Sequence, residues 1–120
     1  MAKVYLTSVK NISNLPDKCL KLLIARKKLE NMEGINWVFN LSPSKKLFWD
    51  YKKDIISWEQ YEKRYKNELK DNYNTLLKIK MFVENDINIA LICYCEDYNY
   101  CHRRLIGEKL QSMGLQVIYG

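Results

Sequence analysis

The chain has 120 residues, of which 48% are hydrophobic and 28% are charged, a balance that is typical of a globular protein and excludes intrinsic disorder and fibrous repeats. This length suits one hydrophobic core, so we expect a single domain over residues 1–120. The net charge of +6 favours a small anionic or nucleotide-type ligand and leaves nucleic acid open as a partner. Because many lysines are scattered among Asn, Ile and Tyr, a plain solvated surface explains the charge about as well.

Two features bear on where the protein works. No stretch approaches the about 18 consecutive apolar residues that a membrane span needs, and residues 1–6 run into a strand-like pattern rather than a signal peptide. We therefore expect a cytoplasmic protein that does not contact a membrane. In that compartment the four cysteines are expected to be reduced thiols rather than a disulfide framework. They are Cys19, Cys93, Cys95 and Cys101.

Two strands are predicted in the first quarter of the chain. Residues 3–9 alternate in a strand-like way, with Val4 and Leu6 apolar. Residues 20–25 form a short apolar run that fits a helix or a strand equally well by periodicity alone. Their brevity, and the Pro16-Asp17 step before them, favour a buried strand.

The middle of the chain is predicted to be helical. Ser42 followed by Pro43 is typical of a helix start, and Ser57 with Gln60 forms a capping box at the start of a second helix. A third helix is predicted over residues 73–84. Apolar residues at spacings of three and four give each helix one buried face: Leu47, Phe48 and Tyr51 in the first, Trp58, Tyr61, Tyr65 and Leu69 in the second, and Leu76, Ile79 and Val83 in the third.

The last third of the chain contains a strand, a helix and another strand. Residues 89–93 are continuously apolar, which is typical of a central parallel strand covered on both faces. A final helix follows, ended by Gly114, and residues 115–119 give the last strand. The buried face of this helix is formed by Ile106, Leu110 and Met113. Strands joined by helical crossovers predict an α/β fold with helices on both faces: a three-layer Rossmann-like domain with a small, mainly parallel sheet and a helical middle section.

Residues 93–104 gather three of the four cysteines, the only histidine and a pair of arginines. They lie at the carboxyl end of the central strand, where parallel sheets bind ligands. The last helix begins there, and its free amides and positive dipole end can hold a phosphate and lower the pKa of a nearby thiol. Cys101 is therefore a candidate nucleophile with a pKa below that of a free cysteine. His102 is a candidate acid/base and Arg103 a candidate anion-binding residue, whereas Arg104 is expected to face solvent or pair with Glu108.

The cysteines and the histidine of this segment also have purely structural interpretations. Cys93 and Cys95 can be small buried strand residues, and Cys101 can pack beneath the helix, as most free cysteines do. His102 can cap or orient the loop without taking part in chemistry.

The same segment offers four potential zinc ligands, namely Cys93, Cys95, Cys101 and His102. Their spacing matches no usual structural zinc pattern. Adjacent Cys101 and His102 are difficult to converge on one ion, and a Cys-x-Cys pair in a strand leaves little freedom for a tetrahedron. We therefore expect neither a bound metal nor another cofactor.

A family resemblance rests on several parts of the chain. Cys93, followed after seven residues by Cys101-His102-Arg103, resembles the hallmark of an uncharacterised family, domain of unknown function 488 (DUF488). Residues 22–26 resemble its second strand ending in arginine, residues 41–44 its Leu-x-Pro-Ser turn, and residues 58–65 its central helix. The resemblance implies a compact α/β fold and a pocket shared by Arg26, Ser44, Cys93, Cys101, His102 and Arg103.

Two departures from the family pattern stand out. Cys95 occupies a position where many relatives have an acidic residue, so a carboxylate role there is lost unless neighbouring Glu96 supplies it. The proline that often follows the arginine of the second strand is missing at Lys27 and Lys28. The family offers no established activity, so the resemblance names no reaction.

The leading hypothesis is an enzyme, or enzyme-like domain, that acts on or binds a nucleotide or another phosphorylated ligand. Arg26 and Arg103 would bind the anion, Cys101 would be the nucleophile or a polar wall, and His102 the acid/base. The alternative is a nucleic-acid-binding or protein-interaction module without catalysis, which would use whichever aromatic side chains are exposed. The aromatic residues considered for that role are Trp49, Tyr51, Trp58, Tyr61 and Tyr65.

Overall fold

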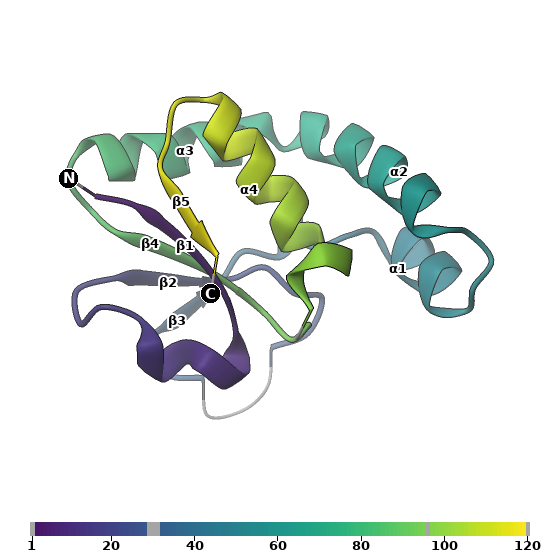
Figure 1. Cartoon of the computed structure of the whole chain (residues 1–120), viewed down its shortest axis with the longest axis horizontal. Helices are drawn as coiled ribbons and strands as arrows, with labels where there is room; N and C mark the ends of the chain where they lie inside the picture. The colour runs from purple at the N-terminus through teal and green to yellow at the C-terminus, as the bar shows by residue number, and fades with distance from the viewer. Residues whose placement is uncertain (1, 29–31, 96, 120) are drawn as a thin grey trace.

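The computed structural model describes residues 2–28, 32–95 and 97–119, and within these ranges a five-stranded parallel sheet forms the centre of the molecule (Figure 1). Its strands are β1 (Val4–Ser8), β2 (Leu20–Leu23), β3 (Ile35–Trp37), β4 (Ile89–Cys93) and β5 (Val117–Tyr119). They lie in the order β3-β2-β4-β1-β5, and every neighbouring pair is parallel. The predicted α/β fold with a parallel sheet is confirmed.

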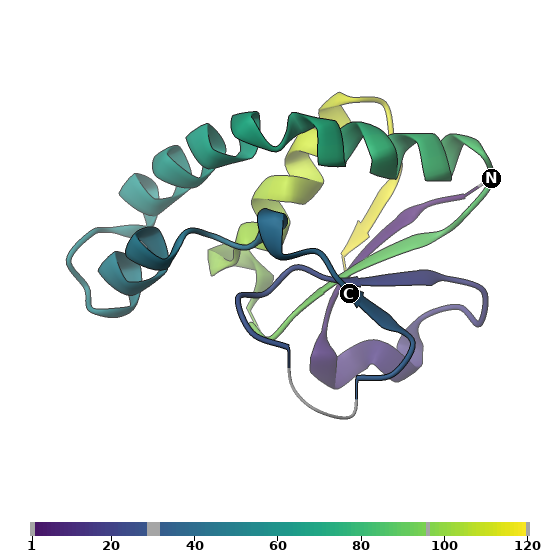
Figure 2. The ribbon, with the colours of Figure 1, turned by 180° about the vertical axis from the view of Figure 1, so that it is seen from behind.

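Helices of two kinds cover the sheet. The α-helices are α1 (Lys45–Lys52), α2 (Trp58–Asp71), α3 (Tyr73–Glu84) and α4 (His102–Ser112), and the 3-10 helices are η1 (Val9–Asn14), η2 (Phe39–Leu41) and η3 (Tyr98–Tyr100). The core on one face of the sheet includes residues from all four α-helices, whereas the core on the other face is completed by η1 and by Met32 (Figures 1 and 2). Among the described residues, no helix has the length and apolar character needed to cross a membrane.

The chirality of parallel crossovers explains this unequal covering. The connections from β1 to β2 and from β2 to β3 run toward the β3 edge, while those from β3 to β4 and from β4 to β5 run toward the β5 edge. Because such crossovers are right-handed in nearly all proteins, connections that run in opposite directions along the sheet lie on opposite faces of it. Residues 9–19 are enough only for η1, whereas residues 38–88 hold α1, α2 and α3. Within residues 2–28, 32–95 and 97–119, the expectation of helices on both faces is therefore met on the second face only by a 3-10 helix.

Several predicted helix boundaries can be compared with the structure. The capping box at Ser57 and Gln60 is confirmed by both of its hydrogen bonds. The start of α1 lies at Ser44 rather than Ser42, because the Ser44 hydroxyl accepts the Leu47 amide, while the Ser42 hydroxyl donates to the carbonyl oxygen of Phe39 in η2. The strand β3 was not predicted, since three residues with two exposed side chains give no periodicity.

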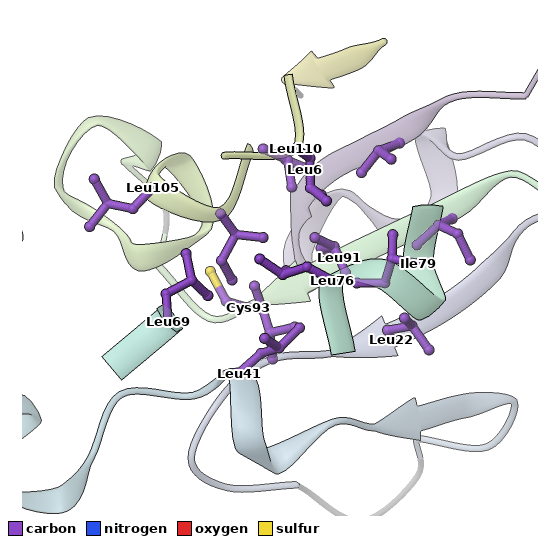
Figure 3. Close-up of a cluster of buried hydrophobic side chains, with 14 of the residues drawn as sticks. Leu6, Leu22, Leu41, Leu69, Leu76, Ile79, Leu91, Cys93, Leu105 and Leu110 are labelled. Carbon is purple, nitrogen blue, oxygen red and sulfur yellow. The ribbon is translucent and has the colours of Figure 1, made fainter. Parts of the chain in front are cut away.

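The main core lies between the sheet and the α-helices (Figure 3). Leu6 from β1, Leu91 from β4 and Leu76 from α3 all belong to this cluster and are almost fully buried. The helix α4 approaches β1 so closely that a Cβ at Gly107 would lie 2.7 Å from the Tyr119 hydroxyl and nearer still to Leu6. This close contact fixes α4 against the sheet and with it the segment that follows β4.

Candidate functional site

The carboxyl end of β4 is a point where the chain changes face. After β1 and β2, the two neighbours of β4, the chain continues on the face of the sheet that η1 covers. After β4 it continues on the opposite face, which α4 covers. Such a reversal opens a crevice where ligands bind in parallel α/β sheets. A cavity of about 260 Å³ lies at this place. It is lined by Ala25, Arg26, Lys27, Pro43, Phe48, Tyr51, Lys52, Tyr61, Cys93, Tyr94, Cys95, Tyr100, Cys101 and His102.

Three free cysteines converge on the inner wall of the cavity, and we refer to Cys93, Cys95 and Cys101 as the thiol cluster. Their Sγ atoms all lie within 4.8 Å of one another, and those of Cys93 and Cys101 are 3.0 Å apart. Cys93 ends β4 and Cys101 is the N-cap of α4. Because the strand ends at Cys93, Cys95 lies beyond it, and the expected lack of freedom in a Cys-x-Cys strand pair does not apply.

His102 lies directly beside the thiol cluster. Its Nε2 is 2.6 Å from the Ile24 carbonyl oxygen, which can only accept, so Nε2 carries the hydrogen. The unprotonated Nδ1 then faces the Sγ of Cys101 at 3.8 Å. Burial lowers the pKa of His102, although the bond to Ile24 opposes this shift, so the ring is neutral at pH 7. It is therefore a base whose free nitrogen points at a thiol.

Arg103 lies behind the thiol cluster and not on the wall of the cavity. Its side chain is 1% exposed, and Nη1 donates to the Sγ of Cys93 at 3.0 Å and to the carbonyl oxygen of Cys95. Burial lowers the pKa of Arg103, but the sulfur of Cys93 outweighs it and the net shift is upward. The structure therefore brings Cys93 and Cys101 to one cavity, as predicted, and places Arg103 as a support for the cysteines.

The three thiols differ in acidity. Hydrogen bonds from Cys101 and Cys93 lower the pKa of Cys95 to about 2, although burial opposes them. The hydrogen bond from Cys101 also favours ionisation of Cys93. However, the hydrogen bond that Cys93 donates to Cys95, together with burial, raises the pKa of Cys93 to about 11. The pKa of Cys101 is raised, first because its thiol donates hydrogen bonds to Cys93 and Cys95 and second because it is buried. The predicted fall in the pKa of Cys101 is wrong, because two sulfur neighbours and burial outweigh the helix start, and the thiolate is on Cys95.

The outer wall of the cavity combines cationic and aromatic side chains. Arg26 donates from Nη1 to the Pro43 carbonyl oxygen at 2.8 Å, and its guanidinium lies 5.5 Å from the centroid of the Phe39 ring. Lys27 and Lys52 are exposed on the same wall. Sequence reasoning missed both lysines. The position of Lys27 after the second strand was a usable signal, whereas nothing in the sequence singles out Lys52.

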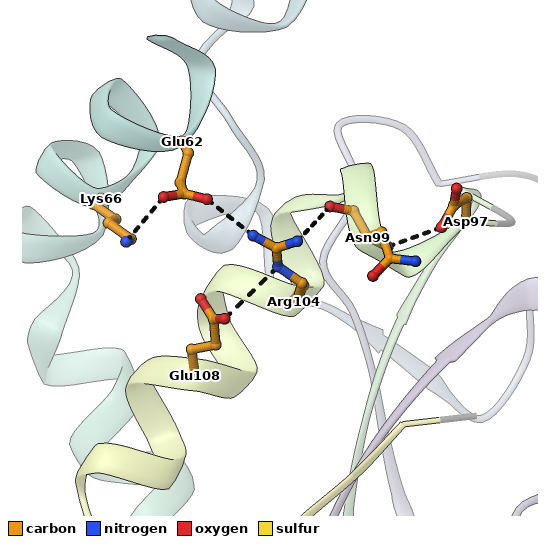
Figure 4. Close-up of polar contacts among 6 residues, drawn as sticks. All are labelled: Glu62, Lys66, Asp97, Asn99, Arg104 and Glu108. Atoms are coloured by element: carbon orange, nitrogen blue, oxygen red, sulfur yellow. Dashed lines mark hydrogen bonds and ion pairs between the residues drawn. The ribbon is translucent and has the colours of Figure 1, made fainter. Parts of the chain in front are cut away.

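Two further predicted residues lie outside this cavity. Ser44 caps α1 and donates from its hydroxyl to Glu68, and it lines a separate hollow that shares only Arg26 and Pro43 with the cavity. Arg104 pairs with Glu62 at 2.9 Å and with Glu108 at 3.7 Å, which confirms the predicted Glu108 pairing (Figure 4). The suggestion that Glu96 supplies a carboxylate falls outside the described residues.

Comparison with known proteins gives a family. Residues 4–114 match the model of DUF488-N3a, which is described as the active DUF488-N3 subclade. This span runs from β1 through α4 and contains the thiol cluster, His102 and Arg103. No curated protein and no solved structure matches the chain.

Proposed function

Because the chain belongs to the DUF488-N3a family, we propose that the cavity beside the thiol cluster is the active site of an enzyme that acts on a nucleotide or another phosphorylated ligand. The description of the family as an active subclade favours catalysis over passive binding. The observation that carries the proposal is the position of Cys95, whose pKa is lowered by hydrogen bonds from Cys101 and Cys93, in the wall of a cavity whose other walls are aromatic and cationic.

Cys95 is the proposed nucleophile. It is the one member of the thiol cluster that is only partly buried, and it lines the cavity. Cys101 and Cys93 donate hydrogen bonds that keep it ionised at neutral pH. Cys101, first expected to attack, is better suited to donate because its side chain is 1% exposed. A thiolate attacking an electrophilic centre of the ligand forms a covalent intermediate that a second step resolves.

His102 and Arg103 take different parts in this scheme. The free Nδ1 of His102 can accept the proton of Cys101 and return it to a leaving group, which is an acid/base role. Arg103 contacts the sulfur of Cys93 and the backbone of Cys95, so it is a positioning residue for the cluster. It does not bind the ligand, because it is not part of the cavity wall.

The ligand follows from the walls of the cavity. Arg26, Lys27 and Lys52 supply positive charge for a phosphate, and a guanidinium can bind it through two parallel bonds. Aromatic side chains can stack on a planar ring; those that line the cavity are Phe48, Tyr51, Tyr61, Tyr94 and Tyr100. The volume of about 260 Å³ lies just below the common range for ligand sites and suits one small molecule. A mononucleotide or a sugar phosphate meets these requirements.

A thermal-shift screen across nucleotides and sugar phosphates tests the proposal, since a ligand that binds only the native state raises its stability. We expect a hit whose shift is lost in Lys52→Ala and retained in Lys78→Ala, a matched lysine on the distant α3 helix. The hit should also protect Cys95 from alkylation. A screen without any stabilising compound, together with an unprotected Cys95, would contradict the proposal.

The alternative of a nucleic-acid-binding module has less support. Tyr61 and Tyr65, two of the aromatic residues it would use, are buried in the core, and Tyr51 and Trp58 are partly buried. Trp49 is the exposed member of that set, and Lys53 lies over its ring. One exposed tryptophan is a small platform for stacking bases.

A further inference from the structure

We propose that the thiol cluster is also a redox centre, in which Cys95 reacts with a small anionic disulfide and Cys93 and Cys101 end as an internal disulfide. This activity needs only the cluster and goes beyond the proposed action on a phosphorylated ligand. It assigns a covalent role to the two buried thiols, which the proposed function uses only as sources of hydrogen bonds and of a proton.

The distances within the cluster are those of thiols ready to be joined. The Sγ atoms of Cys93 and Cys101 are 3.0 Å apart, and a disulfide bond needs an approach of only about 1 Å more. Both residues are 1% exposed, so an external oxidant reaches neither of them directly. Cys95 lines the cavity and lies within 4.8 Å of both, so it can act as the entry point.

The reaction begins at the accessible thiolate. The Cys95 sulfur attacks one sulfur of a disulfide RSSR, the RS–SR bond breaks, and one RS⁻ leaves with the electron pair. Cys95 is now capped and no longer charged. The negative charge that disfavoured ionisation of Cys101 is thereby removed. Cys101 then passes its proton to Nδ1 of His102, which is 3.8 Å away.

Two exchanges complete the cycle. Cys101 attacks the Cys95 sulfur and expels the second RS⁻, which takes the proton from His102. The Cys93 thiol then gives up its proton, which the RS⁻ released in the first exchange takes up. The Cys93 sulfur attacks that of Cys101, 3.0 Å away, and Cys95 leaves as a thiolate. A thiolate of low pKa is a good leaving group in such an exchange, which favours this direction. In total two protein thiols are oxidised and one RSSR is reduced to two RSH.

The charge of the surroundings favours this chemistry over metal binding and selects the oxidant. The guanidinium of Arg103 lies 3.0 Å from the sulfur of Cys93, where it would repel a cation. Arg26, Lys27 and Lys52 on the cavity wall attract an anion instead. A disulfide that carries carboxylates should therefore react faster than one that carries amines.

Incubation of the full chain with oxidised glutathione, without any nucleotide, tests the proposal. We expect intact mass spectrometry to show loss of two hydrogens, and peptide mapping to join Cys93 to Cys101. Cystamine, a cationic disulfide, should react more slowly than oxidised glutathione, and added salt should reduce the difference. Cys19→Ser should behave as the unchanged protein, because Cys19 is remote from the cluster and packs on the opposite face of the sheet.

Variants separate the steps. Cys95→Ser should slow the oxidation at least about tenfold, because the accessible thiolate is gone. Cys93→Ser should accumulate a disulfide between Cys95 and Cys101, and Cys101→Ala should retain glutathione on Cys95. Circular dichroism before the reaction checks that each variant is folded.

Three results would overturn the proposal: a disulfide that involves Cys19, unchanged oxidation of folded Cys95→Ser, or stoichiometric zinc bound by the three cysteines. The first two leave the thermal-shift test of the proposed function untouched. Equally, a failed ligand screen leaves the redox reaction standing.

Discussion

The two ends of β4 are equally buried but differ in chemistry. Toward its amino end Ile89 and Leu91 share an apolar core with Leu76. At its carboxyl end the same core continues into sulfur, imidazole and guanidinium groups that are also nearly inaccessible. Buried polar groups cost free energy unless each has a partner, and here His102 and Arg103 both have one.

This difference shows how the fold supports reactivity. The apolar end supplies stability that offsets the cost of the polar end. At the polar end, hydrogen bonds among the thiols, together with burial, shift the pKa values. One packing arrangement thus accounts for the thiolate of Cys95, the neutral ring of His102 and the protonated thiols of Cys93 and Cys101. The four predictions below test the contrast, beginning with the largest expected effect.

Leu76→Ala should lower the free energy of unfolding by about 3 kcal/mol, since it removes a fully buried side chain and leaves a cavity. Urea unfolding followed by circular dichroism measures this change. The pH profile of Cys95 alkylation should stay the same, because Leu76 lies in the apolar part of the core. An altered profile would show that the two ends of β4 are not independent.

The reactivity of Cys95 should depend far less on pH than that of Cys19. Because hydrogen bonds from Cys101 and Cys93 lower the pKa of Cys95 to about 2, its thiolate is formed well below pH 5, and its alkylation rate should be flat between pH 5 and pH 7. Burial raises the pKa of Cys19, so its rate should fall about 100-fold over the same two units. Peptide mass spectrometry after timed iodoacetamide labelling gives both rates. Parallel pH profiles for the two cysteines would remove the basis for a Cys95 nucleophile.

Tyr65→Phe tests the boundary between the two regions. The buried Tyr65 hydroxyl donates to the Leu41 carbonyl oxygen at 2.6 Å, and the ring packs edge-on against His102. Loss of the hydroxyl should lower the free energy of unfolding by about 1–2 kcal/mol, because the carbonyl is left without this donor. Thermal unfolding measures the loss. The ring contact with His102 remains, so ligand-induced shifts should be retained.

Arg104→Ala should have the smallest effect, about 1 kcal/mol, because ion pairs that remain in contact with solvent contribute little and those of Arg104 are only partly buried. Arg104 bonds to Glu62 and to the backbone of Asn99 on the surface next to the site. Its neighbour Arg103 is buried, so Arg103→Ala should be much more damaging in the same urea titration. Equal effects of the two substitutions would contradict the assigned positions of this arginine pair.

The sequence by itself determined most of the architecture. Local patterns predict where elements lie and which of their sides faces the core. Examples are the apolar run of β4, the capping box of α2 and the apolar spacing in α3. The gathering of thiols, imidazole and arginines in residues 93–104 was equally visible, so the family and the place of the candidate site followed from the sequence.

Tertiary packing decided what each site residue does. Cys101 and Arg103 lie within two residues of each other, yet one lines the cavity and the other supports it from behind. Lys52 reaches the cavity from α1, and Ser44 at the start of that helix does not. The direction of a side chain beyond a strand end depends on elements distant in the chain. The acidity of a thiol depends on neighbours that only the fold brings within hydrogen-bonding reach, and this is why Cys95 rather than Cys101 carries the thiolate.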